Sequence, residues 1–204
     1  MFRTAAAGYA HRWTWEAVMA GSASGNIIDD IIADHREFES VFVEIESGGD
    51  PRTQPELVEH VIAGIVRHAV AEEQYVYPAA RKVLPDGDEV ADHELKEHAE
   101  AEEVMKAIEK AGPEDSRYDE LVHQLISDIR HHIEEEENGL LSKLRDACPS
   151  ERLHELSEEF QRAKSMAPTR PHPLAPDHPP ANKILGPGAG LVDRLRDMLS
   201  GRNS

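Results

Sequence analysis

Apolar side chains recur every three or four residues along most of the chain. In residues 26–46 the apolar stripe advances by alternating steps of three and four, through Ile28, Ile31, His35, Phe38, Phe42 and Ile45. That spacing is typical of an α-helix that buries one face. Three more stretches have the same spacing. One begins near Pro55, and the other two cover about 88–111 and 116–146. No convincing strand pattern is present, so the chain is predicted to be all-α.

Short turn-forming sequences separate these helices. They lie at 48–51, 84–88, 112–113 and 148–150, and a fifth helix is expected over about 151–165. Glycine and proline in such positions end helices. Pro78, inside the second helix, is expected to kink it or end it early. Helices of this length joined by short turns predict an antiparallel up-down-up-down four-helix bundle with a fifth helix.

The two ends of the chain differ from its middle. Residues 1–24 are expected to form a flexible extension, and residues 25–165 the bundle with its extra helix. Residues 166–204 form a Pro-rich tail, which is expected to be extended rather than helical over 166–190. A short amphipathic helix is expected at 190–200.

Two of the predicted helices carry a histidine and a glutamate where the stripe would otherwise be apolar. They are His68 with Glu72 in the second helix and His132 with Glu136 in the fourth. Residues four apart lie on one face of an α-helix, so each pair can direct an imidazole nitrogen and a carboxylate to one point. Of the adjacent His131 and His132, only His132 keeps the spacing to Glu136.

The other two long helices each place one histidine in the stripe, His35 and His98. Burying polar and charged groups without partners costs free energy, and a pair of metal ions would supply those partners. Imidazole suits iron, copper, zinc and nickel. Two carboxylates can bridge two ions with one oxygen on each, so a di-iron centre is the expected occupant.

Composition narrows the expected partners. The chain has 40 acidic and 22 basic residues, which gives a formal net charge of −18. That charge repels nucleic-acid phosphates and anionic membrane surfaces, so neither is expected as a partner. No apolar run is long enough to span a membrane. The single cysteine, Cys148, excludes an intrachain disulfide and favours a reducing, cytoplasmic location.

The stretches that carry these residues resemble the hemerythrin-like, HHE cation-binding family. They read ADHREFESVF, RHAVAEEQYVYPAAR, LKEHAEAEEVMKAI and HHIEEEENGLLSKL, and the tail is similar to those of some bacterial members. The resemblance implies a four-helix bundle that holds two Fe ions in a non-haem, oxo-bridged di-iron centre. Carried over residue by residue, the family's metal ligands fall on His35, His68, Glu72, His98, His132 and Glu136.

The third helix departs from the oxygen-carrying members, which have two histidines four residues apart there. The residue four before His98 is Glu94, and the nearby His93 lies about 140° around the helix from His98. Tyr75 lies about one turn beyond Glu72. Tyr75, His93, Glu94 and water are therefore alternatives for completing the ligand set.

The residues around the six candidates are expected to have ordinary roles. Phe38 and Tyr75 are expected to shield the centre from water. Glu73 and the acidic run 134–137, apart from Glu136, are expected to face solvent.

An altered ligand set with more open positions favours redox chemistry over reversible oxygen carriage. The leading hypothesis is a non-haem di-iron protein that binds O2 or related oxidants as small ligands. Catalase-like decomposition of hydrogen peroxide, in oxidative stress defence, is the activity it suggests. The alternative is an iron- or oxygen-responsive sensor or interaction module without turnover. A ferritin-like oxidase fits less well, because that class uses Glu-x-x-His pairs.

Overall fold

The computed structural model describes residues 25–48 and 52–171. These residues form helices and the turns between them, with no strand, which confirms the predicted all-α class. The elements are α2 (Ile27–Glu46), α3 (Gln54–Ala71), η1 (Glu72–Val76), α4 (Tyr77–Val83), α5 (Gly87–Ala111), α6 (Tyr118–Asn138), α7 (Leu140–Ala147) and α8 (Ser150–Met166). The predicted extension 1–24, the predicted helix 190–200 and the tail beyond residue 171 lie outside the described residues.

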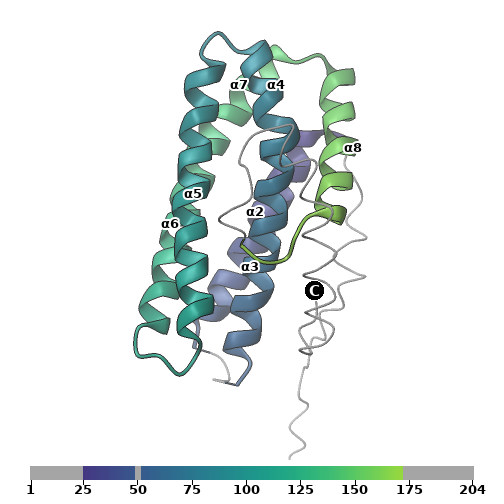
Figure 1. The fold of residues 1–204 in the computed structure, drawn as a ribbon. Helices are drawn as coiled ribbons and strands as arrows, with labels where there is room; N and C mark the ends of the chain where they lie inside the picture. Colours follow the sequence, from purple (N-terminus) through teal and green to yellow (C-terminus); the bar gives the residue numbers. More distant parts are fainter. Residues whose placement is uncertain (1–24, 49–51, 172–204) are drawn as a thin grey trace, which may run out of the picture.

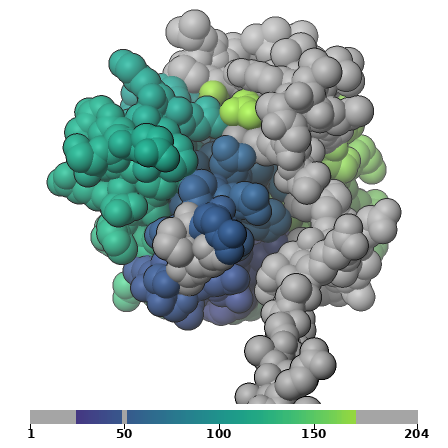
Figure 2. Space-filling model, turned by 90° about the horizontal axis from the view of Figure 1, so that it is seen from below, coloured from purple at the N-terminus to yellow at the C-terminus, as the bar shows by residue number. Residues whose placement is uncertain are grey.

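The long helices α2, α3, α5 and α6 lie alongside one another and form the body of the molecule (Figure 1). Seen from one end, the teal pair α5 and α6 lies beside the purple-to-blue pair α2 and α3 (Figure 2). The fifth helix, α8, packs against α2 and α3. None of the helices in the described ranges is long and apolar enough to cross a membrane.

The interior is divided into two apolar clusters. The first cluster combines the start of α2 with α4, α7 and α8, and it includes Ile28, Leu141 and Phe160. The second cluster combines the rest of α2 with α3, α5 and the first part of α6, and it includes Phe42 and Ile108. Buried histidines and carboxylates occupy the same helices between the two clusters. A polar layer therefore crosses the core of the bundle.

The second helix runs through Pro78 instead of ending there. Its central turn, η1, is π-helical, and the Tyr77 N–H donates to the carbonyl of Glu72, five residues earlier. Proline lacks an N–H, and in an α-helix its ring clashes with the carbonyl four residues back. The wider π turn gives the ring room, so α4 continues from η1 without a break. The predicted early end was therefore wrong, and the perturbation appears as a π turn.

The predicted helix 116–146 is interrupted once, at Gly139, which separates α6 from α7. A Cβ atom at Gly139 would lie 2.8 Å from the carbonyl oxygen of Glu135. Only glycine fits that close approach without a shift of the backbone. The break lies one turn beyond the polar layer, so it leaves His132 and Glu136 on one continuous helix.

Candidate metal centre

The six predicted ligand residues meet in the polar layer of the core. His35 comes from α2, His68 from the end of α3, Glu72 from η1, His98 from α5, and His132 and Glu136 from α6. Every one of them is buried, and both glutamates are fully inaccessible to solvent. Helical periodicity explains the convergence, because each residue replaces an apolar side chain on the inner face of its helix.

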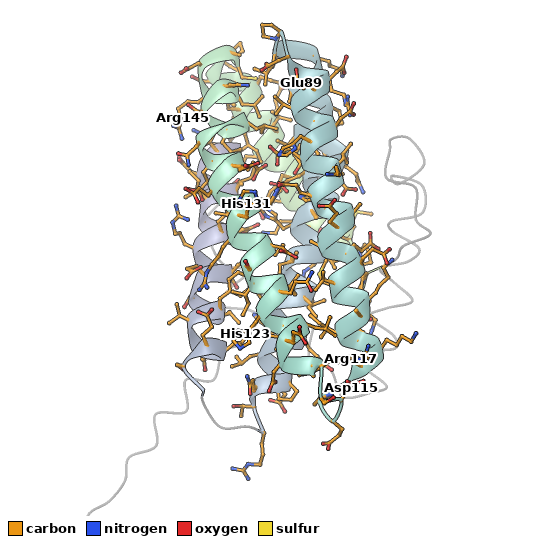
Figure 3. The ribbon with its side chains drawn as sticks, turned by 90° about the vertical axis from the view of Figure 1, so that its left-hand side faces the viewer. Glu89, Asp115, Arg117, His123, His131 and Arg145 are labelled. Carbon is orange, nitrogen blue, oxygen red and sulfur yellow. The ribbon has the colours of Figure 1, made fainter. Side chains whose placement is uncertain are left out.

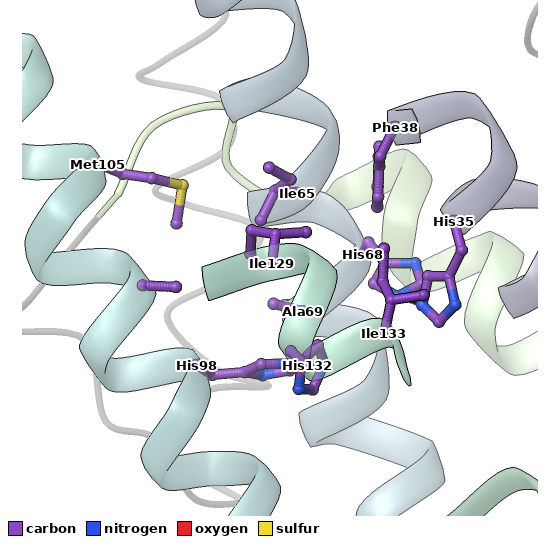
Figure 4. A pocket seen from close by; sticks show the side chains of 11 residues that line it. His35, Phe38, Ile65, His68, Ala69, His98, Met105, Ile129, His132 and Ile133 are labelled. Atoms are coloured by element: carbon purple, nitrogen blue, oxygen red, sulfur yellow. Dashed lines mark hydrogen bonds between the residues drawn. The ribbon is translucent and has the colours of Figure 1, made fainter. Parts of the chain in front are cut away.

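The four histidines form two pairs whose Nε2 atoms face each other. The Nε2 atoms of His35 and His68 are 3.2 Å apart, and those of His98 and His132 are also 3.2 Å apart. Figure 4 shows the two pairs on neighbouring helices beneath a group of apolar side chains.

Glu72 lies between the pairs. Its Oε1 is 3.0 Å from His68 Nε2, and its Oε2 is 3.5 Å from His98 Nε2. Glu136 approaches the first pair, with Oε2 at 3.4 Å from His35 Nε2. Two groups of potential metal-ligating atoms result, one made of His35, His68, Glu72 and Glu136 and the other of Glu72, His98 and His132. Because Glu72 belongs to both groups, it has the position of a bridging carboxylate.

A carboxylate supports the outer nitrogen of each histidine. The Nδ1 distances to these carboxylates are 2.9 Å for His35 and Glu137, 2.9 Å for His68 and Asp34, 3.1 Å for His98 and Glu73, and 2.9 Å for His132 and Glu97. Such outer carboxylates orient imidazole ligands and raise their basicity. The expectation that Glu73 and Glu137 face solvent was therefore wrong, since both bind buried histidines across a helix interface.

These outer contacts follow one rule around the bundle. Each supporting carboxylate lies next in sequence to one of the six inner residues and binds the inner histidine of a neighbouring helix. Asp34 of α2 supports α3, Glu73 of η1 supports α5, Glu97 of α5 supports α6, and Glu137 of α6 supports α2. In the sequence these carboxylates come directly before His35 and His98 and directly after Glu72 and Glu136.

The outer contacts also decide what the inner nitrogens can do. A carboxylate accepts hydrogen bonds, so each Nδ1 carries the proton, and Nε2 of a neutral imidazole then presents a lone pair. Two lone pairs 3.2 Å apart repel each other unless a cation or a proton lies between them. Neither oxygen of buried Glu136 accepts a hydrogen bond. The donor set therefore fits a buried metal site.

The pKa shifts of the inner histidines show where the surrounding carboxylates favour a positive charge. Burial, together with the charge of His68, lowers the pKa of His35 to about 4. Burial also opposes protonation of His68, but the charge of Glu72 and the contact with Asp34 outweigh it and raise its pKa. For His132, Glu94 and Glu97 outweigh burial and raise the pKa well above its usual value. The carboxylates around His68 and His132 thus favour a positive charge at these two positions.

Tyr77 was not among the residues predicted from the sequence. It begins α4, and its side chain contacts His98 of α5, the helix on which a second histidine ligand was missing. Its hydroxyl lies 3.0 Å from His98 Nε2 and donates to Glu72 Oε2 at 3.4 Å. Burial and the charge of Glu72 raise the pKa of this phenol well above 10, so it stays protonated. The π turn brings the residue five positions after Glu72 onto the ligand face, where an α-helix would bring positions three or four. Tyr75 packs against the first apolar cluster instead.

The other two alternatives for the third helix lie behind the inner histidines. Glu94 is buried, with Oε2 3.2 Å from the outer nitrogen Nδ1 of His132. The side chain of His93 is 51 % exposed and contacts Glu135 at 2.8 Å. Neither side chain is in contact with the paired Nε2 atoms.

A small apolar cavity borders the inner nitrogens. It has about 20 Å³ of space for a molecule the size of water. That space corresponds to roughly one water-sized molecule. All four inner histidines line it, together with Phe38, Ile65, Ala69, Ala101, Met105, Ile129 and Ile133 (Figure 4). Phe38 thus has the predicted shielding position. The cavity admits a small uncharged ligand to the histidines and offers few polar partners for anything larger.

Comparison with known proteins places this site in a family. The model of the hemerythrin HHE cation-binding domain matches residues 26–144, which include all six inner residues. The chain belongs to the hemerythrin HHE cation-binding family. An uncharacterised hemerythrin-like protein of Schizosaccharomyces pombe is 31% identical over 174 residues, which are 85% of this chain and 86% of that protein.

A second relative of this hemerythrin-like chain is named as a DNA nickase of Nostoc sp. It is 28% identical over 145 residues, which are 71% of this chain but only 41% of the nickase. No solved structure gave a significant match. The predicted family resemblance is confirmed, and the buried histidines and glutamates form groups that could hold a metal ion.

Proposed function

We propose that this chain holds two iron ions at the polar layer and binds O2 or hydrogen peroxide there. The proposal is carried by two pairs of histidines whose Nε2 atoms face each other. An outer carboxylate orients each of the four rings. His35, His68, Glu72 and Glu136 would hold one ion, and Glu72, His98 and His132 the other. A bound iron pair supplies electron transfer to a small oxidant.

The surrounding residues control what reaches this site. The apolar cavity selects a ligand of two to four atoms and keeps bulk water away from the histidines. The protonated Tyr77 hydroxyl, 3.0 Å from His98 Nε2, can donate a hydrogen bond to an oxidant held beside it. Decomposition of hydrogen peroxide is the activity we expect this arrangement to support.

We also propose that residues 25–165 form one domain with an up-down-up-down arrangement. The order of the clusters along the chain supports this. α2 and α5 pass from the first apolar cluster to the second, and α3 passes from the second to the first. α6 lies in the second cluster and is followed by α7 in the first, so it runs in the same direction as α3. Residues 166–204 would be appended to that domain.

The test compares His132→Ala with His123→Ala, an exposed histidine on the same helix. The wild-type protein and the control should contain two irons per chain, show the charge-transfer absorption of a di-iron centre, and consume hydrogen peroxide. His132→Ala should lose iron, absorption and turnover together. Two irons per chain in His132→Ala would contradict the ligand assignment. If the iron-loaded wild type did not consume hydrogen peroxide, the proposed peroxide decomposition would be excluded and only the proposed binding of iron and oxidant would remain.

A sensor without turnover is the second candidate, and the contacts of α8 favour it. Lys164 of α8 binds Asp34, which in turn binds the outer nitrogen of His68. Metal binding energy is also folding energy, so iron could be coupled to the docking of α8 and the segment after it. Under this alternative, iron removal should speed limited proteolysis after residue 166. Equal cleavage with and without iron would argue against it.

A further inference from the structure

A second group of histidines and carboxylates lies on the outer surface of α5 and α6. It consists of His93 and Glu97 from α5 and Glu135 from α6, with His131 of α6 beside both carboxylates, and we call these four residues the surface cluster. Figure 3 faces this side of the molecule and shows His131 on α6, above His123. The two histidine side chains are 51 % and 63 % exposed. The surface cluster is therefore open to ions in solution.

Each carboxylate of the surface cluster contacts both histidines. Glu135 lies 2.8 Å from His93 Nε2 and 3.4 Å from His131 Nε2. Glu97 Oε1 lies 3.7 Å from His93 Nε2 and 3.9 Å from His131 Nε2. Ligand atoms around a tetrahedral Zn²⁺ with bonds of about 2.0–2.1 Å are roughly 3.3 Å apart. His93, Glu97 and Glu135 each offer one atom within 4.8 Å of the other two, so these three side chains are spaced like the ligands of a single ion, and His131 lies at the edge of the set.

We propose that the surface cluster is a separate binding site for one borderline divalent cation, of which Zn²⁺ is the probe. Two imidazoles and two carboxylates on adjacent helices supply the donors that such ions prefer. Two carboxylates neutralise the charge of the ion, and the chain's net charge of −18 attracts cations to it. Both histidines already lie within 4.0 Å of both carboxylates, so the side chains can bind an ion without a change in the backbone.

The surface cluster is connected to the buried layer through one residue. Glu97 presents Oε1 to the surface histidines, while its Oε2 lies 2.9 Å from Nδ1 of His132. A cation on the surface therefore lies one carboxylate away from a buried histidine. Substitution of the two surface histidines leaves Glu97 in place, so it separates the surface site from the buried one.

The experiment titrates Zn²⁺ into the iron-loaded full chain by calorimetry. The variant combines His93→Gln with His131→Gln. The control combines His123→Gln with His154→Gln, which removes two exposed histidines outside the surface cluster. His154, like the surface histidines, contacts a glutamate. We expect the wild type and the control to bind one more Zn²⁺ per chain than the variant. Iron content should be equal in all three.

Three results would overturn the proposal. They are equal Zn²⁺ binding by variant and wild type, no Zn²⁺ uptake by the iron-loaded wild type, and loss of iron from the variant. If the chain bound no iron at all, the buried layer could take up Zn²⁺ as well. The difference of one equivalent between wild type and variant would still report the surface site, so its outcome is distinct from that of the di-iron proposal.

Discussion

At the scale of single residues, each buried histidine depends on a carboxylate from a neighbouring helix. The contact fixes the proton on Nδ1 and turns the lone pair of Nε2 inward, where it repels its partner in the absence of a cation. Under the proposed function, the affinity for metal therefore depends on four outer carboxylates as well as on the six inner residues.

Glu73→Gln tests this dependence, because within residues 25–48 and 52–171 the side chain that Glu73 binds is that of His98. The carbonyl oxygen of an amide can still accept from Nδ1–H, but the amide is neutral, so the ring loses the negative charge that raises its basicity. We expect iron affinity to fall by about 10- to 100-fold, measured by competition with a chelator. Glu134→Gln, an exposed residue of the same acidic type, is the matched control and should bind iron like the wild type.

The inner residues could be predicted from the sequence and the outer ones could not. His35, His68 and His132 stand where helical periodicity demands an apolar side chain, so one helix at a time reveals them. The outer role of Glu73 or Glu137 exists only across a helix interface. Within its own helix, each of these residues resembles any solvated acid.

At the scale of elements, the π turn η1 has the largest effect on the site. A sequence does not reveal whether a backbone hydrogen bond spans four residues or five, so α-helical periodicity favoured Tyr75 over Tyr77. The combination of a tyrosine with a proline directly after it, inside a strong helical pattern, is the feature that marks the turn. Proline was expected to end the helix, and it is instead accommodated by the wider turn.

Tyr77→Phe should keep the fold and alter the site. The variant loses a buried hydrogen bond, so the free energy of unfolding should fall by about 1 kcal/mol. Peroxide consumption by the iron-loaded protein should fall further than iron content does, because the hydroxyl lies at the open position. Tyr118→Phe, a buried tyrosine at the start of α6, is the control. Equal turnover in Tyr77→Phe and wild type would show that the hydroxyl has no part in it.

The element α8 covers the side of the metal centre formed by α2 and α3. Phe160 is fully buried and packs edge-on against the His68 ring, with centroids 5.5 Å apart. Lys164 binds Asp34 behind the same histidine. α8 thus supports one ligand from two directions.

Phe160→Ala should therefore affect stability and metal together. Loss of a buried phenylalanine costs about 3–5 kcal/mol of unfolding free energy, which urea denaturation can measure. Iron should also dissociate faster, since the His68 ring loses its packing partner. Phe42→Ala, at a fully buried position in the second apolar cluster, should cost a similar free energy with little effect on the iron off-rate. Identical off-rates in the two variants would contradict a role for α8 at the site.

At the scale of the whole molecule, the polar layer separates two apolar clusters that share the helices α2, α3 and α5. A bound cation would offset more of the free energy cost of burying its carboxylates than the contacts with histidine do. The stability of the bundle should therefore depend on metal to a degree that the apolar clusters alone do not set.

Removing iron with a chelator should lower the melting temperature measured by calorimetry. A ligand present at 1,000 times its Kd contributes about 4 kcal/mol to the folded state. Iron added back should restore the original transition. His132→Ala provides the comparison, and its melting temperature should respond weakly to iron. A transition in the wild type that is the same with and without iron would mean that the layer holds no tightly bound cation.

The polar layer also has a consequence for helix register. Sliding one helix along its neighbours by a single turn, about 5.4 Å, would keep an apolar face against an apolar face along most of its length. It would also push a histidine or glutamate into an apolar cluster and leave the layer one donor short, at a cost of several kcal/mol. The buried histidines and glutamates thus fix the register of each helix against its neighbours. They disfavour bundles in which one helix is shifted by a turn.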